Sequence, residues 1–189
     1  MERWDGTVLD INSTCADLGP KSLQLLGMHA LTGCDTTSYP YAKGKVSALK
    51  TMLAGDFSDL DDLLGEVGVT QADLMKVAIT FFIAMYGLPR GTSIESARFA
   101  IFAKNKKNPK VMALPTTSAN PLQHVLRAHL QMMLWKAADE RGPPHESDDI
   151  TQFGWEFHDG ISVPVIAQRD AAPTQLIGVI KCQLSLIHI

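Results

Sequence analysis

Two long amphipathic patterns constrain the fold of this chain more than any other feature of its sequence. In the first, Thr70 and Asp73 have the spacing of a helix capping box, and a wide apolar stripe follows them: Leu74, Val77, Ala78, Phe81, Phe82 and Met85. The second begins at Pro121 and carries its own stripe: Leu122, Val125, Leu126, His129, Leu130 and Met133. Apolar residues at this spacing predict helices that bury one face. We therefore expect both helices to form the core of a mainly α-helical protein.

Shorter patterns surround these two helices. Pro20 predicts the start of a helix that Gly33 ends, with Leu23, Leu26 and Ala30 on its inward face. Three short runs have strand character and lie near the two ends of the chain: residues 7–11, 161–165 and 176–182. The predicted fold is accordingly mainly α with a few short strands near both ends.

Composition excludes several classes of protein. The 189 residues are 46% hydrophobic, which is ample for a core, and the net charge of −3 excludes a uniformly basic nucleic-acid-binding protein. Three cysteines without a CxxC spacing favour neither a disulfide framework nor a zinc site. Since the longest apolar run is too short to cross a bilayer, we expect a soluble protein that does not bind membranes. An intracellular location is predicted, with the nucleus as a candidate compartment.

The most specific stretch of the sequence runs from His29 to Lys50. Gly33 can leave a helix through a positive φ, and Asp35 follows on a tight, hydroxyl-rich loop. Further on, Gly44 lies in a turn that opens a second helix. The apolar face predicted for that helix consists of Val46, Ala48, Leu49 and Met52.

A helix that begins in a glycine-containing turn can offer free backbone N–H groups to a phosphate. Lys43, Lys45 and Lys50 add positive charge to the same region. Together with Gly44 they are the predicted DNA-binding residues, and they would contact the phosphate backbone without reading bases. A second basic segment, residues 104–110, is another candidate for phosphate contact, although a plain surface loop fits it equally well.

At Gly33-Cys34-Asp35 and Gly44 the chain resembles the flap-endonuclease family of structure-specific, PIN-like nucleases. These proteins carry a Gly-Cys/Ser-Asp motif followed by a helix–two-turn–helix element. The resemblance implies the helical C-terminal portion of a PIN-like α/β nuclease fold, with Asp35 as a catalytic residue and ligand of Mg²⁺ or Mn²⁺. It also implies that the turn at Gly44 holds duplex DNA by its amides, often around a monovalent cation. Ala42 stands where the family's first turn glycine is expected.

The stretch from His29 to Ser38, with Gly44 and Lys45, is similar more closely still to a group of animal proteins, often transposon-associated, that carry a degenerate nuclease of this type. The resemblance divides the chain into a nuclease-like portion at residues 1–88 and a helical or α+β extension at residues 89–183. Residues 184–189, LSLIHI, resemble the translated mosaic-end adapter of sequencing libraries. We therefore expect the truncated C-terminal part of a longer nuclease-like protein.

Several readings stay open from the sequence. Asp35 could be an ordinary turn residue, and the three lysines could be a solvated face. A phosphodiesterase centre needs several carboxylates around its metal ions, and the chain offers only Asp35 in a suitable setting. The predicted function is therefore backbone binding to duplex DNA by a chain that is inactive alone. The alternative is a non-enzymatic, transposon-derived interaction or DNA-binding module.

Overall fold

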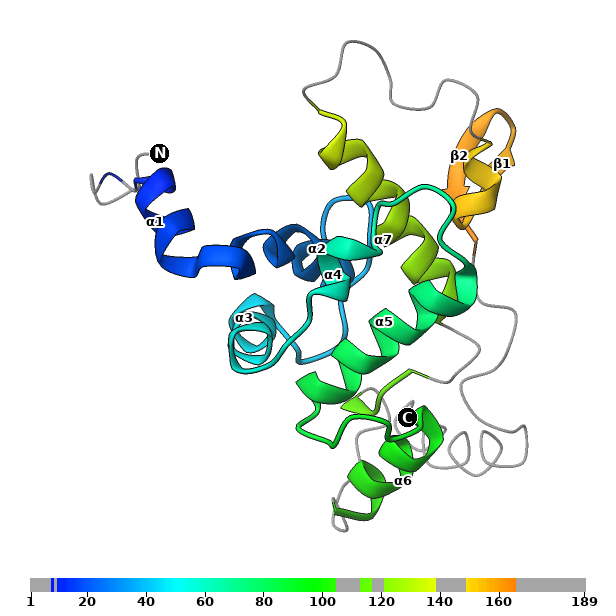
Figure 1. Cartoon of the computed structure of the whole chain (residues 1–189). Helices are drawn as coiled ribbons and strands as arrows, with labels where there is room; N and C mark the ends of the chain where they lie inside the picture. Colours follow the sequence, from blue (N-terminus) through cyan, green and yellow to red (C-terminus); the bar gives the residue numbers. More distant parts are fainter. Residues whose placement is uncertain (1–7, 9, 105–112, 117–120, 139–148, 166–189) are drawn as a thin grey trace, which may run out of the picture.

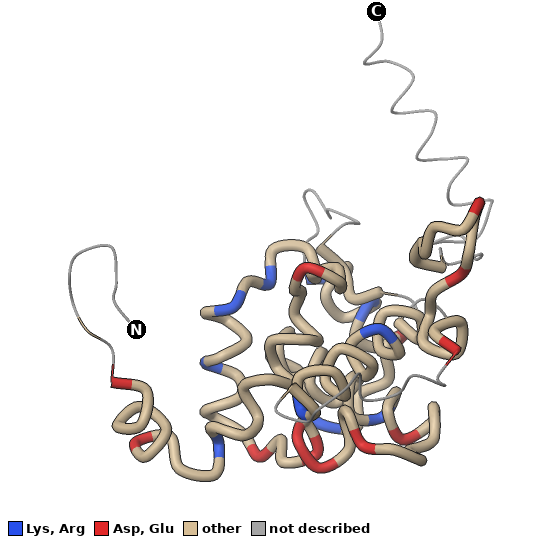
Figure 2. The backbone as a smooth tube through the Cα atoms, turned by 90° about the horizontal axis from the view of Figure 1, so that it is seen from above, with Lys and Arg blue, Asp and Glu red and all other residues tan. Residues whose placement is uncertain are grey.

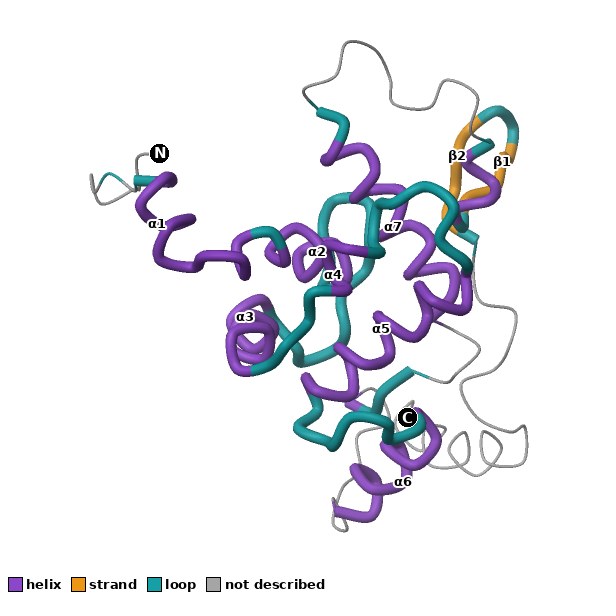
Figure 3. Tube along the Cα trace, viewed as in Figure 1, coloured by secondary structure: helices purple, strands orange, loops and turns teal. Residues whose placement is uncertain are grey.

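The computed structural model describes residues 8, 10–104, 113–116, 121–138 and 149–165. These residues are mainly helical, and their strands are confined to one hairpin (Figures 1 and 3). The elements are α1 (Ile11–Leu18), the 3₁₀ helix η1 (Gly19–Ser22), α2 (Gln24–Leu31), α3 (Lys45–Ala54), α4 (Asp59–Asp62), α5 (Gln71–Met85), α6 (Ile94–Lys104), α7 (Pro121–Lys136), the 3₁₀ helix η3 (Ile150–Phe153), β1 (Trp155–His158) and β2 (Ile161–Pro164). The mainly α prediction is confirmed at this level.

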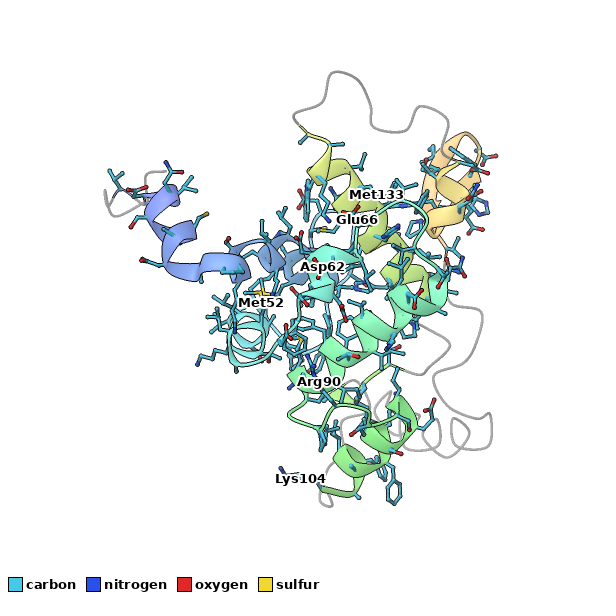
Figure 4. The ribbon with its side chains drawn as sticks, viewed as in Figure 1. Met52, Asp62, Glu66, Arg90, Lys104 and Met133 are labelled. Atoms are coloured by element: carbon cyan, nitrogen blue, oxygen red, sulfur yellow. The ribbon has the colours of Figure 1, made fainter. Side chains whose placement is uncertain are left out.

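The core is built around α7, which packs against both α5 and α2, and the two amphipathic patterns predict the buried faces of α5 and α7 (Figure 1). Phe81 of α5 is fully buried, and its ring meets that of Phe57 edge to face at 5.2 Å between centroids. Met52 of α3 is also fully buried and lies on the side of α3 that faces the other helices (Figure 4). The same hydrophobic cluster thus includes α7, which lies beyond the boundary predicted at residue 88.

Helix α5 begins as its sequence predicts. The Thr70 hydroxyl accepts a hydrogen bond from the Asp73 N–H (3.2 Å) and donates one to the Asp73 carboxylate (2.7 Å). The cap is therefore confirmed. The Asp73 carboxylate, however, accepts from the Thr70 hydroxyl, whereas in a capping box it would accept from the Thr70 backbone N–H.

The inward face predicted for α2 is wrong in part. Ala30 is fully buried, but Leu23 and Leu26 are 59% and 43% exposed. The buried face of α2 carries Gly27 instead, because the backbone of Leu60 in α4 lies so close that a Cβ at Gly27 would stand 2.1 Å from its carbonyl oxygen. Contact at this distance is possible only through a glycine, so the crossing with α4 decides which side of α2 is buried.

Two predictions near the N-terminus and on α3 also need correction. Ile11, expected in a β-prone run, begins α1, because the Asp10 carboxylate accepts hydrogen bonds from the N–H groups of Asn12 (3.0 Å) and Ser13 (3.2 Å) and caps that helix. Val46, expected on the apolar face of α3, is 70% exposed. Helix α1 itself buries none of its residues and extends away from the helical body (Figure 1).

The C-terminal part of the described chain contains an antiparallel hairpin. Strands β1 and β2 pair with Trp155 opposite Pro164 and His158 opposite Ile161. Asp159 and Gly160 join them with positive φ at both positions, as a tight hairpin turn requires. The strand predicted at residues 161–165 is thereby confirmed, whereas the run at 176–182 lies outside the described residues.

Basic side chains donate hydrogen bonds to backbone carbonyls at the ends of several helices. The Lys21 ammonium donates to the carbonyl oxygen of Gly55 (3.1 Å) after α3, and the Lys136 ammonium donates to that of Asp61 (2.6 Å) in α4. The last carbonyls of a helix lack partners within it and carry partial negative charge, so a cation there is favourable. Within the described parts of the chain, no helix is both long and apolar enough to span a membrane.

Candidate functional site

Asp35 lies at the tip of a tight turn directly after α2. Cys34 and Thr37 exchange backbone hydrogen bonds of 3.2 Å in both directions, which leaves Asp35 and Thr36 exposed between them. The buried Thr37 hydroxyl donates to the carbonyl oxygen of Ala30 (2.8 Å) and ties the turn to α2. Gly33 enters the turn with φ +104°, so the predicted glycine exit from the helix is confirmed.

Helix α7 holds the same turn from its other side. The His124 ring bridges two groups: its Nε2 donates to the carbonyl oxygen of Leu31 (3.0 Å), and in the neutral ring its Nδ1 accepts from the Ser38 hydroxyl (3.1 Å). Further along α7, the Gln131 side chain accepts a hydrogen bond of 2.6 Å from the Thr36 hydroxyl. The Asp35 turn is thus fixed by contacts to two helices.

The chemistry of this turn does not amount to a metal centre. Among the residues that the structure describes, no group of three or more His, Cys, Asp or Glu side chains is placed to hold a metal ion. A two-metal phosphodiesterase site needs several oxygen ligands, and Asp35 supplies one carboxylate. The described residues therefore do not fit Mg²⁺ or Mn²⁺ at Asp35, and the metal assignment of this residue stays a prediction.

The pKa of the Cys34 thiol is shifted by its surroundings in the turn. Burial by itself would raise the pKa of its thiol, but hydrogen bonds with Thr36 and Thr37 outweigh burial and lower the pKa. Its Sγ lies 3.1 Å from the Thr37 hydroxyl and 3.4 Å from that of Thr36. The two contacts hold Cys34 in the turn.

The turn before α3 contains a left-handed residue and an exposed glycine. Ala42 adopts φ +56°, the left-handed conformation that glycine favours, at the position where the family's first glycine would stand. Gly44 has φ −82°, and a Cβ built on it would meet nothing within 4 Å. Neither the backbone conformation nor the packing of this chain therefore requires a glycine at position 44.

Helix α3 begins without a side-chain cap. Its first helical hydrogen bond runs from the Ala48 N–H to the Gly44 carbonyl oxygen (3.1 Å), so the amides of the three preceding residues have no acceptor within the helix. Gly44 and Val46 are both exposed at this end. The N-terminus of α3 is thus open to an acceptor from outside the chain.

The predicted DNA-binding lysines are not equivalent. The Lys45 ammonium turns inward and donates to three oxygens at the end of α2: the carbonyls of His29 (2.7 Å) and Gly33, and the hydroxyl of Thr32 (2.9 Å). Burial lowers the pKa of Lys45, and the nearby Cys34 thiol opposes that shift.

The Lys43 ammonium is also engaged within the chain. It donates to the carbonyl oxygen of Met85 (2.9 Å) at the end of α5 and lies 4.6 Å above the centre of the Tyr86 ring. Lys50, by contrast, is exposed on α3. The three lysines therefore share one region of the fold, but two of them stabilise helix ends.

An open pocket of about 430 Å³ lies between the two turns. Its walls come from the end of α2, from the turn before α3 and from the start of α3: Thr32, Gly33, Tyr39, Pro40, Ala42, Lys43, Gly44 and Lys45. The second basic segment, residues 104–110, is described only at its first residue. Beyond Lys104, which lies at the outer end of α6 (Figure 4), it is outside the described residues.

Comparison with protein-family models, with curated proteins and with solved structures yields no match. The resemblance to PIN-like nucleases therefore stays a prediction carried by the Gly33-to-Gly44 motif. The structure adds that Ala42 takes a glycine-like conformation at the variant position. It also shows three contributions that no sequence pattern indicated: the clamp by His124, the inward ammonium of Lys45 and the exposed ring of Tyr39.

Two histidines of α7 should make stability depend on pH. His129 is buried and its Nδ1 accepts a hydrogen bond from the Gly65 N–H (2.9 Å), which requires the neutral ring. Burial lowers the pKa of His129, the Lys136 ammonium lowers it further, and the Glu66 carboxylate opposes them. Burial likewise lowers the pKa of His124, with the hydrogen bond to Leu31 opposing and Arg127 adding to the shift.

Because both folded pKa values lie below those of the unfolded chain, their contribution to stability is complete above a pH of about 6.5. It is lost as the pH falls from there through the folded values. We expect the urea concentration at the midpoint of unfolding to decrease when the pH is lowered from 7.5 to 5.5. The variant His129→Asn keeps an acceptor for the Gly65 N–H but cannot titrate, so its midpoint should fall less. An equal fall in both proteins would contradict this role for His129.

Proposed function

We propose that this chain binds the phosphate backbone of duplex DNA through the N-terminus of α3. The observation that carries the proposal is the open start of this helix at Gly44, where free amides coincide with a glycine that the chain itself does not need. Amides at a helix N-terminus and the positive end of the helix dipole together bind phosphate, and a residue without a side chain lets a backbone approach closely.

The surrounding charge supports the same partner. Lys50 lies on the exposed side of α3, and the inward ammonium groups of Lys43 and Lys45 still contribute positive charge close to the helix end. Figure 2 shows basic positions along one edge of the helical body, while most acidic positions lie elsewhere. A patch of this kind attracts a polyanion even though the whole chain has a net charge of −3.

The proposal is confined to binding. Metal-dependent cleavage would need carboxylates in addition to Asp35, and Mg²⁺ is not held by a single protein ligand in such sites. We therefore assign Asp35 no catalytic step in this chain. A nuclease activity with Mg²⁺ or Mn²⁺ would belong to a longer form that supplies the other ligands.

One observation favours the alternative of a protein-interaction module. On the outer side of α3, Val46 and Leu53 flank Lys50 at helical spacing and are 70% and 40% exposed. An apolar pair on an exposed face is typical of protein interfaces as well as of isolated surface residues. Binding to DNA that depends steeply on salt would favour the phosphate contact over this alternative.

Gly44→Asp tests the proposal because it should change stability and binding in opposite directions. An aspartate at this position can cap the free amides of α3, so the free energy of unfolding should rise by roughly a few tenths of a kcal/mol. The same carboxylate occupies and repels the phosphate site. We expect the affinity for a labelled duplex, followed by fluorescence anisotropy at low salt, to fall about tenfold, as loss of one charge-assisted contact of about 1.4 kcal/mol implies.

Gly44→Asn is the matched control, since it has the same shape and capping ability without the charge. Its affinity should lie between those of the wild type and Gly44→Asp. Lys50→Glu should weaken binding to all duplex sequences alike and reduce the salt slope. If Gly44→Asp binds duplex DNA as the wild type does, the N-terminus of α3 is not the phosphate site.

A further inference from the structure

Two tyrosines stand beside the open start of α3, and nothing in the proposed backbone contact uses them. Tyr39 is 78% exposed and Tyr41 is 42% exposed, on either side of Pro40. A large aromatic ring that stays exposed to water does not gain the favourable free energy that burial of such a ring usually contributes. Two of them within three residues, next to a candidate phosphate site, mark a surface that a flat ligand could cover.

The position from which the Tyr39 ring extends is fixed by the fold. A Cβ built on Gly33 would lie 2.7 Å from Tyr39 Cβ and 3.2 Å from Tyr39 Cα, so the backbone of Tyr39 packs directly onto this glycine. Pro40 restricts the backbone on the other side, because a residue before proline is held to extended conformations. The ring therefore starts from a rigid base, and little backbone freedom is lost when a ligand covers it.

Tyr39 also forms part of the wall of the 430 Å³ pocket. Pro40 and Ala42 add apolar surface to that wall. Lys43 and Lys45 also line it, and their ammonium groups, which donate to Met85 and to the end of α2, keep positive charge close to it. Pockets of about 300–1,000 Å³ accept small organic ligands. A flat heterocycle joined to a phosphate matches these walls, because the heterocycle fits the aromatic side and the phosphate fits the cationic side.

We propose that this pocket takes an unpaired nucleotide of single-stranded DNA, with its base stacked on Tyr39 and its phosphate at the start of α3. This assignment rests on the proposed phosphate contact and adds the class of ligand. In a duplex both faces of each internal base are already stacked, so only an unpaired base can use the ring. Stacking on tyrosine is tolerant of sequence, and so the preference is for strand state and not for base identity.

The test compares a labelled single strand with a duplex of the same sequence, using the full chain and fluorescence anisotropy. Tyr39→Ala should weaken binding of the single strand about tenfold, because stacking of one base on an aromatic ring contributes about 1–3 kcal/mol. Binding of the duplex should change less than twofold. Tyr39→Phe keeps the ring and should bind both ligands as the wild type does. Since Tyr39 is exposed, none of these variants should change the urea midpoint.

Cross-linking adds a readout that affinity alone does not give. A single strand that carries 5-iodouracil, irradiated on the wild-type chain, should attach to the peptide containing Tyr39. If Tyr39→Ala and the wild type bind the single strand equally, or if the cross-link maps elsewhere, the nucleotide pocket is wrong. In that case a loss of duplex binding in Gly44→Asp would still support the phosphate contact, so the two proposals fail separately.

Discussion

Replacing Gly27 by alanine is expected to destabilise the protein by roughly 1–3 kcal/mol. A Cβ at this position would lie 2.1 Å from the carbonyl oxygen of Leu60 and 3.0 Å from its carbonyl carbon. Both are backbone atoms, so α2 and α4 must move apart and open the core between them. Helix propensity alone predicts the opposite sign, because alanine is favoured over glycine by about 1 kcal/mol inside a helix.

Urea unfolding at constant pH measures this effect through the midpoint and slope of the transition. Gly44→Ala is the matched control, since its φ of −82° suits alanine and a Cβ there meets nothing within 4 Å. Its stability should stay within about 0.5 kcal/mol of the wild type. A Gly27→Ala protein as stable as the wild type would show that α2 and α4 do not cross at this glycine.

Lys45→Met is expected to cost about 1.5–3 kcal/mol, the range for hydrogen bonds to charged groups, with the lower end favoured because the ammonium is partly exposed. The substitution keeps most of the aliphatic stem but removes the cation from its three acceptors at the end of α2. It leaves the last carbonyls of that helix without their partner. The expected result is a lower urea midpoint together with a more mobile Asp35 turn.

Lys50→Met provides the comparison, because Lys50 is exposed on the same helix. Its stability should change by less than about 0.5 kcal/mol. Equal midpoints for the two variants would show that the Lys45 ammonium does not hold the end of α2. The pair also decides how DNA binding is tested: a loss of affinity in a Lys45 variant would mix unfolding with lost charge, whereas Lys50→Glu reports on charge alone.

Local patterns in the sequence predicted several elements correctly. The stripe after Thr70 predicts α5, and Pro121 predicts the first residue of α7. Gly33 leaves α2 with the positive φ expected of it, and the run at 161–165 forms β2. In each case the signal lies within a few residues of the chain, where capping, proline geometry and side-chain periodicity act directly.

The sequence predicted which stretch of the chain forms the candidate site, but not the side-chain contacts within it. The motif from Gly33 to Gly44 placed Asp35 on a turn and α3 behind a glycine, and both positions agree with the structure. The motif could not show that Lys45 points back to α2. The acceptors of its ammonium are carbonyls at the end of α2, and their partial negative charge depends on that helix being packed beside Lys45. Nor could the motif show His124, which contacts Leu31 from 93 residues further along the chain.

The sequence by itself determined the starts of α5 and α7 and the exit from α2, because these signals depend on neighbours along the chain. Only the tertiary structure decided which face of α2 is buried. On α2 a glycine faces inward and Leu23 and Leu26 face water, since the backbone of Leu60 approaches too closely for any side chain. Hydrophobicity favours burial of leucine, but the close crossing of two backbones excludes it at this contact.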